Sequence, residues 1–91
     1  MLNPNEEGRF KQLLFYVEEN PRSVYTLHIG NTKVLVYFDT CFESDNGLEM
    51  DESGYEEFWC IVFQNINTGE LFEVNYHNLP DQVWAGKIQV I

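Results

Sequence analysis

The densest set of chemically capable side chains lies in residues 43–57, a stretch without any Lys or Arg. Carboxylate oxygens in loops bind Ca²⁺, but an EF-hand needs ligands at fixed spacing, with Gly at position six and Glu at position twelve. Counting from Glu49 places Gly54 at six but Cys60 at twelve. We therefore predict no metal site and interpret the stretch as a long solvated loop that attracts a basic partner. Its acidic residues are Glu43, Asp45, Glu49, Asp51, Glu52, Glu56 and Glu57.

A second set of titratable residues is predicted to share one face of a β-sheet. A metal or catalytic site needs three or four such groups within a few ångströms. In an up-and-down sheet His28 and His77 would lie three strands apart, roughly 14 Å at ~4.8 Å per strand. Neither cysteine stands in a Cys-X-X-Cys motif, and no Gly-rich loop precedes a helix. We predict no catalytic residue and no cofactor from the set His28, Asp39, Cys41, Glu73 and His77.

The composition predicts one globular domain over residues 1–91, with an acidic surface. Five basic and fifteen acidic residues give a formal net charge of −10. Such a charge disfavours nucleic acid and anionic membranes as partners and favours a basic protein surface. No apolar run approaches the roughly 18 residues of a membrane helix. The first ten residues do not resemble a signal peptide, so we predict a cytoplasmic protein with reduced cysteines.

The first element that can position these groups is an N-terminal helix. Pro4 suits the first helical position, Asn3 can cap the helix, and Pro21 cannot continue it. The apolar residues that follow have the spacing of one helix face. They are Phe10, Leu13, Leu14 and Val17.

Two hairpins are predicted to follow. Residues 23–29 and 32–42 are rich in β-forming residues and flank a Gly30-Asn31 turn. Residues 58–66 and 70–76 flank a loop of Asn67, Thr68 and Gly69, which would pair Val62 with Val74. Residues 78–86 would form a short helical turn and residues 87–91 a last strand. The predicted fold is α+β, with the helix packed on a four- to five-stranded antiparallel sheet. A small curled β-barrel with the same helix is the alternative.

The alternation of side chains divides the predicted sheet into a core face and a mixed face. Cys60 and Val62 are expected on the core face beside Val36 and Phe38, so Cys41 points away from Cys60 and no disulfide is expected. The mixed face then carries an apolar stripe that is too large to remain exposed. Its members are Leu35, Tyr37, Trp59, Ile61 and Phe63.

Three explanations of this stripe remain open from sequence. The C-terminal turn could cover it with Val83 and Trp84, the sheet could close into a barrel, or a protein could bind there. The aromatic residues would anchor a partner, and Glu49, Asp51 and Glu52 would attract it.

We therefore predict a small, acidic, non-enzymatic protein-binding module, such as an inhibitor or an immunity-type protein for a basic partner. Antitoxins and nucleic-acid mimics share this general character. A homodimeric structural protein is one alternative. A small ligand-binding protein or enzyme that uses the histidine-bearing sheet face is another.

Overall fold

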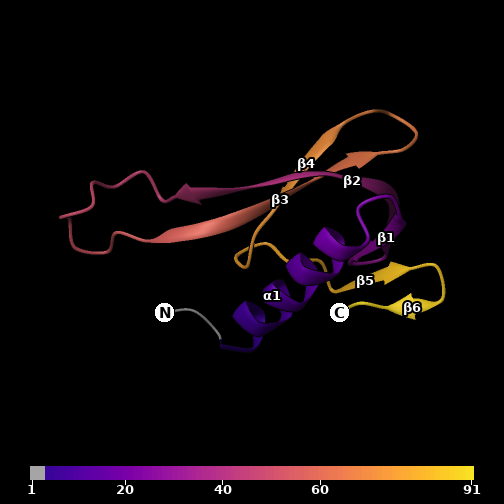
Figure 1. Cartoon of the computed structure of the whole chain (residues 1–91), viewed down its shortest axis with the longest axis horizontal. Helices are drawn as coiled ribbons and strands as arrows, with labels where there is room; N and C mark the ends of the chain where they lie inside the picture. Colours follow the sequence, from indigo (N-terminus) through magenta and orange to yellow (C-terminus); the bar gives the residue numbers. More distant parts are fainter. Residues whose placement is uncertain (1–3) are drawn as a thin grey trace.

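One helix packs on an antiparallel sheet in the computed structural model, which describes residues 4–91 (Figure 1). The sheet has six strands in the order β4-β3-β2-β1-β5-β6 and is open, with β4 and β6 at its edges. The predicted α+β fold is confirmed, and the barrel alternative is not the fold that forms. The elements are α1 (Pro4–Glu19), β1 (Val24–Ile29), β2 (Thr32–Asp45), β3 (Glu57–Asn65), β4 (Leu71–Val74), β5 (Gln82–Ala85) and β6 (Ile88–Gln89).

Helix α1 has the predicted bounds and buries the predicted face. It begins at Pro4, while the proposed cap at Asn3 lies outside the described residues. The side chains of Leu13 and Val17 are fully buried, and Phe10 is only 4% exposed. Burial of this apolar face, rather than helix propensity, holds such a helix in place.

The C-terminal segment was predicted wrongly as a helical turn, because residues 82–85 form strand β5. Val83 pairs with Leu27 and Trp84 with Thr26, so β5 extends the sheet beyond β1. Val and Trp favour strands, and the free edge of β1 offers backbone partners that an isolated helical turn lacks. Gly86 then turns the chain with a φ of 60° into β6. The sheet consequently has six strands.

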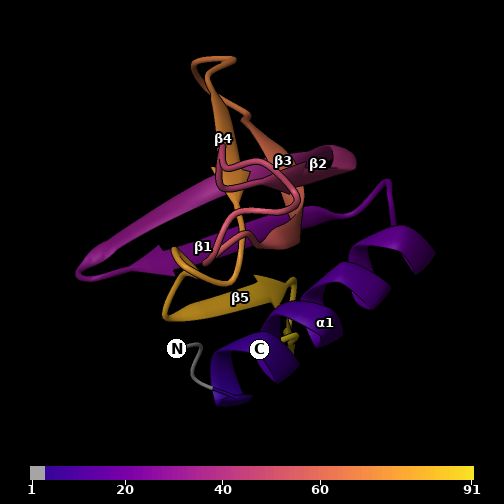
Figure 2. The same ribbon diagram turned by 90° about the vertical axis from the view of Figure 1, so that its left-hand side faces the viewer.

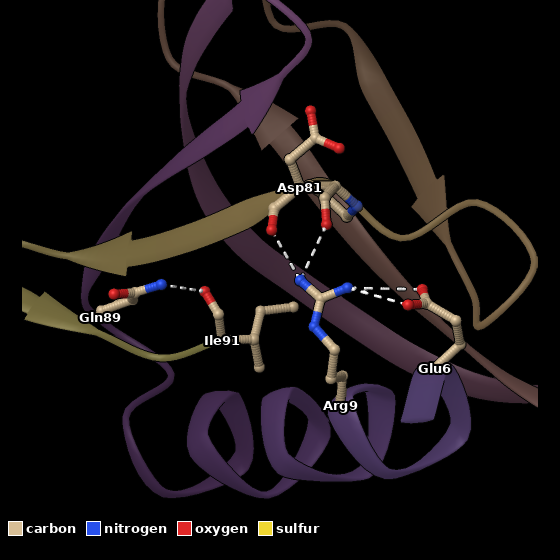
Figure 3. Close-up of polar contacts among 6 residues, drawn as sticks. Glu6, Arg9, Asp81, Gln89 and Ile91 are labelled. Carbon is tan, nitrogen blue, oxygen red and sulfur yellow. Dashed lines mark hydrogen bonds and ion pairs between the residues drawn. The ribbon is translucent and has the colours of Figure 1, made fainter. Parts of the chain in front are cut away.

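Arg9 fastens α1 to the segment that leads into β5 (Figure 3). Its Nη2 donates to the Asp81 carbonyl at 2.7 Å, and its Nη1 donates to Glu6 Oε1 at 3.1 Å. The Asp81 carboxylate in turn accepts a hydrogen bond from the Gly30 amide at 2.8 Å. Figure 2 shows β5 alongside α1 as a result.

The predicted register of β3 was wrong by one residue on both of its sides. Strand β2 has a bulge between Phe38 and Thr40, so that Phe38 lies opposite Phe63. On the other side, the loop spans residues 65–70, and Ile61, not Val62, lies opposite Val74. An extra residue in a strand inverts the direction of every side chain beyond it.

The shifted register exchanges the two faces of β3. Ile61 and Phe63 point toward α1 and are fully buried, whereas Cys60 and Val62 point to the opposite face. These two are also buried, at 3% and 7% exposure. Cys41 pairs with Ile61, so the two cysteines still lie on opposite faces and are free thiols.

Beyond the bulge, β2 and β3 continue as a two-stranded arm that passes α1, and the far end of this arm projects beyond the other strands (Figure 1). Pairing runs as far as Asp45 opposite Glu57. Three acidic residues assigned to the loop from sequence are therefore strand residues with defined directions: Glu43, Asp45 and Glu57.

Candidate partner-binding surfaces

The predicted partner-binding residues do not form one surface. Ile61 and Phe63 were wrongly predicted on the mixed face, because the bulge and the longer loop turn them into the core under α1. Trp59 is 43% exposed and lies on the α1 side of β3. Leu35 and Tyr37 lie on the opposite, open face of the sheet, each 46% exposed. The predicted charged residues are exposed near the tip of the arm: Glu49, Asp51 and Glu52.

The predicted titratable face is also dispersed. His28 stacks on Trp84 with ring centroids 6.3 Å apart. His77 follows β4, and its Nε2 lies 3.6 Å from Glu56 Oε1. The Cys41 thiol donates to Glu18 Oε1 at 3.8 Å, on the α1 side of the sheet. In residues 4–91 no group of three or more His, Cys, Asp or Glu side chains is arranged to hold a metal ion.

A groove of about 270 Å³ lies between α1 and the start of β3. Its apolar lining is Phe10, Leu14, Phe15, Phe58, Trp59 and Tyr76, and its charged lining is Glu7, Lys11 and Glu57. Phe15 is 65% exposed and Trp59 43% exposed, although both are large apolar side chains. Exposed aromatic residues around a concave surface are typical of a site that binds another molecule.

Carboxylates continue this groove along the arm. Glu57 lies two residues before Trp59 on the same side of β3, with Asp45 directly opposite, and Glu43 is opposite Trp59. Like charges facing each other across a strand pair destabilise the sheet. The fold thus holds three carboxylates beside an aromatic ring at an energetic cost.

The pKa of Tyr55 is raised by the carboxylates that surround its hydroxyl. Its hydroxyl donates to Glu57 Oε1 at 2.7 Å. This hydrogen bond, with smaller contributions from partial burial and from the charges of Glu57, Asp45 and Glu43, raises the pKa of Tyr55 to about 12. The negative potential of this part of the arm therefore acts on a phenol that is itself neutral at pH 7.

The opposite wall of the groove carries a paired cation. Lys11 Nζ lies 3.4 Å from Glu7 Oε1, one helical turn away. Near the end of α1, Glu18 contacts the Cys41 thiol of β2. Burial raises the pKa of this thiol, and the negative charge of Glu18 raises it further. The groove is thus apolar at its centre and predominantly acidic around its edge.

A second exposed apolar surface lies on the open face of the sheet, away from α1. Its side chains come from three strands and are between 43% and 58% exposed: Val24, Leu35, Tyr37 and Leu71. This surface retains Leu35 and Tyr37, two of the five residues of the stripe that the sequence predicts.

Sequence reasoning missed Phe15 and the three strand carboxylates as surface features. Phe15 stands between the core positions Leu14 and Val17, so it was not assigned to the apolar helix face. Nothing in the sequence marks these carboxylates as strand residues, because residues 41–45 read Cys-Phe-Glu-Ser-Asp and do not alternate between apolar and polar side chains.

Comparison with known proteins identifies a family for most of the chain. Residues 9–78 match the family model described as "Cognate immunity protein YxxD". No curated protein and no solved structure matches the chain. The matched span contains every lining residue of the groove except Glu7, and it contains the whole arm. Among residues 4–91, no helix is long and apolar enough to cross a membrane.

Proposed function

Because the chain belongs to the family of cognate immunity proteins YxxD, we propose that it binds a cognate protein toxin through a basic surface of that toxin and thereby blocks it. Membership of an immunity family implies a protein partner. The basic character of the partner's surface and an encounter in the cytoplasm are the finer parts of the proposal.

The main observation in support of the proposal is that exposed aromatic and acidic side chains lie next to one another where the arm passes α1. Trp59 and Phe15 offer large, exposed contact areas of the kind that anchor protein interfaces. The carboxylates of Glu43, Asp45 and Glu57 lie beside Trp59 on the arm. With a net charge of −10, the protein would speed the encounter with a cationic partner.

The proposed action is stoichiometric and non-enzymatic. The immunity protein covers a functional surface of the toxin and holds it covered, so that its effect depends on the affinity and lifetime of the complex. Charge at the edge of the interface would govern the association rate, while the aromatic anchors would govern dissociation.

The test begins with capture of the toxin. The protein is immobilised and exposed to extracts and secreted proteins of cells that carry its gene, at low and high salt, and bound proteins are identified by mass spectrometry. The captured protein is then expressed in a host cell with and without this chain. We expect growth arrest that the wild-type chain relieves and a complex of fixed stoichiometry. Growth arrest that the chain does not relieve would contradict the proposal.

A homodimer is the second candidate, favoured by the exposed apolar side chains of the open sheet face. Sedimentation velocity of the wild-type protein and of Leu35→Glu distinguishes it. A dimer that the substitution dissociates would support self-association through this face. A wild-type monomer at tens of micromolar would contradict it.

A further inference from the structure

We propose that the groove between α1 and the arm is a docking site for an arginine side chain of the partner. This inference rests on the proposed function and names the group that the toxin would insert. Its occupant is a guanidinium, seated against the ring of Trp59 and facing the carboxylates of Glu57 and Asp45.

The shape and lining of the groove support a long side chain that is apolar along its stem. The groove has about 270 Å³ and is lined mainly by aromatic and aliphatic groups. The methylene stem of arginine packs on such surfaces while its charged end reaches more polar surroundings. Trp59 lines the groove and is still 43% exposed, so part of its side chain is available for contact with a partner.

The carboxylates beside the groove indicate that the end of the inserted side chain is positively charged. Glu57 lines the groove, with Asp45 opposite it and Glu43 opposite Trp59 in the pairing of β2 with β3. Among residues 4–91, Lys11 pairs with Glu7, and none of the ion pairs involves these three carboxylates. A cation from a partner would neutralise the repulsion that the arm otherwise carries.

Arginine fits this combination better than lysine does. The guanidinium is planar, donates to carboxylates in a fork and stacks on aromatic rings. The ammonium group of lysine is a compact, strongly hydrated charge that does not stack.

The test uses small probes with the isotope-labelled full chain. N-acetyl-arginine-N-methylamide is titrated and followed by nuclear magnetic resonance. The neutral probe of the same shape is N-acetyl-citrulline-N-methylamide, and N-acetyl-lysine-N-methylamide tests the guanidinium itself. The two tryptophans provide an internal control, because Trp59 lines the groove and Trp84 lies on the open face, where its Nε1 donates to Gln82.

We expect the arginine probe to shift the Trp59 indole and the amides of Phe15 and Glu57 saturably. Binding of the citrulline and lysine probes should be at least fivefold weaker. Glu57→Gln should weaken arginine binding at least threefold, while Tyr37→Ala should leave it unchanged. Equal binding of the three probes, or shifts at Trp84 in place of Trp59, would overturn the proposal.

Experiments with the captured toxin distinguish a failure of this proposal from a failure of the proposed function. If the groove receives the toxin, Trp59→Ser and Glu57→Gln should each weaken the complex, Trp59→Ser at least tenfold, while both variants remain folded by circular dichroism. Full protection and unchanged affinity for Glu57→Gln and Trp59→Ser would overturn the groove as the docking site, yet would leave the immunity function standing. Failure of the wild-type chain to protect would contradict the immunity function itself.

Discussion

Asp45 and Glu57 face each other as the last pair of the arm between β2 and β3. Two carboxylates in this relation repel each other across the strand pair. Both are exposed, so water and salt screen the repulsion in part. The pair is therefore a modest cost to stability, located where we propose that a cation of the partner binds.

The first prediction follows from that repulsion. Glu57→Gln or Asp45→Asn should raise the free energy of unfolding by about 0.2–1 kcal/mol, because either change removes one of the facing charges. Each amide keeps the oxygen that accepts a bond, from the Tyr55 hydroxyl or from the Gly47 amide. Urea denaturation at low salt measures the gain, which should shrink in high salt. Lower stability in both variants would contradict the argument.

The second prediction concerns the helix that forms one wall of the groove. Leu13 is fully buried, so Leu13→Ala should lower the free energy of unfolding by about 2–5 kcal/mol through lost burial and a residual cavity. The matched control is Phe15→Ala, because Phe15 is 65% exposed on the same helix. Its stability should remain within about 0.5 kcal/mol of the wild type. Equal destabilisation by both variants would show that Phe15 belongs to the core.

The helix and the first hairpin could be predicted from sequence because local patterns determine them. The apolar spacing in α1 has the helical period, and the Gly30-Asn31 turn leaves little freedom in the pairing of β1 with β2. The strand type of residues 58–65 was equally evident. The boundaries of these elements can be predicted because signals within a few neighbouring residues determine them.

The faces of β3 could not be predicted in the same way. Residues 58–63 are apolar on both sides of the strand, so hydrophobic pattern does not choose a register. The choice depends on the bulge between Phe38 and Thr40, which no local sequence signal marks. The candidate site depends on the same register: Leu35, Tyr37 and Trp59 are exposed, but they lie on different faces of the sheet.

The third prediction concerns the thiols. Cys60 is 3% exposed, so only Cys41 should react in the native protein, while two thiols should react after unfolding. Burial and Glu18 raise the pKa of Cys41, which lowers its thiolate fraction at pH 8 and slows alkylation. Glu18→Gln removes the neighbouring charge and should accelerate the reaction of Cys41. Mass spectrometry after timed labelling measures both effects, and a mass lower by two hydrogens without labelling would contradict the assignment.

The fourth prediction concerns the attachment of the C-terminal hairpin. Arg9→Gln removes the donors to the Asp81 and Pro80 carbonyls and the ion pair with Glu6, and should cost about 1–2 kcal/mol. Lys11→Gln is the control, since it removes only an exposed pair with Glu7 and should cost about 0.3–0.5 kcal/mol. Amide exchange in β5 should become faster in Arg9→Gln alone. Unchanged protection of β5 would show that Arg9 does not hold this hairpin.

The last prediction concerns the tip of the arm, which holds the three charged partner-binding residues predicted from sequence: Glu49, Asp51 and Glu52. Replacing residues 46–56 by a two-residue Asn-Gly turn would keep the strands of the arm paired. The buried core contains no residue of this segment, so the fold should survive with little loss of stability. The Glu56–His77 pair is lost as well, and His77→Gln in the full-length chain controls for that contact.

The rates of binding to the captured toxin then distinguish a role of the arm tip in association from a role in holding the complex together. The excision removes the carboxylates of Glu49, Asp51, Glu52 and Glu56 but leaves the groove and the pair of Asp45 and Glu57. Because charges at the edge of an interface act mainly on encounter, the association rate should fall and depend less on salt, while the dissociation rate stays nearly unchanged. Surface plasmon resonance at two salt concentrations measures both rates. A dissociation rate that rises tenfold would instead place the tip of the arm inside the interface, in direct contact with the toxin.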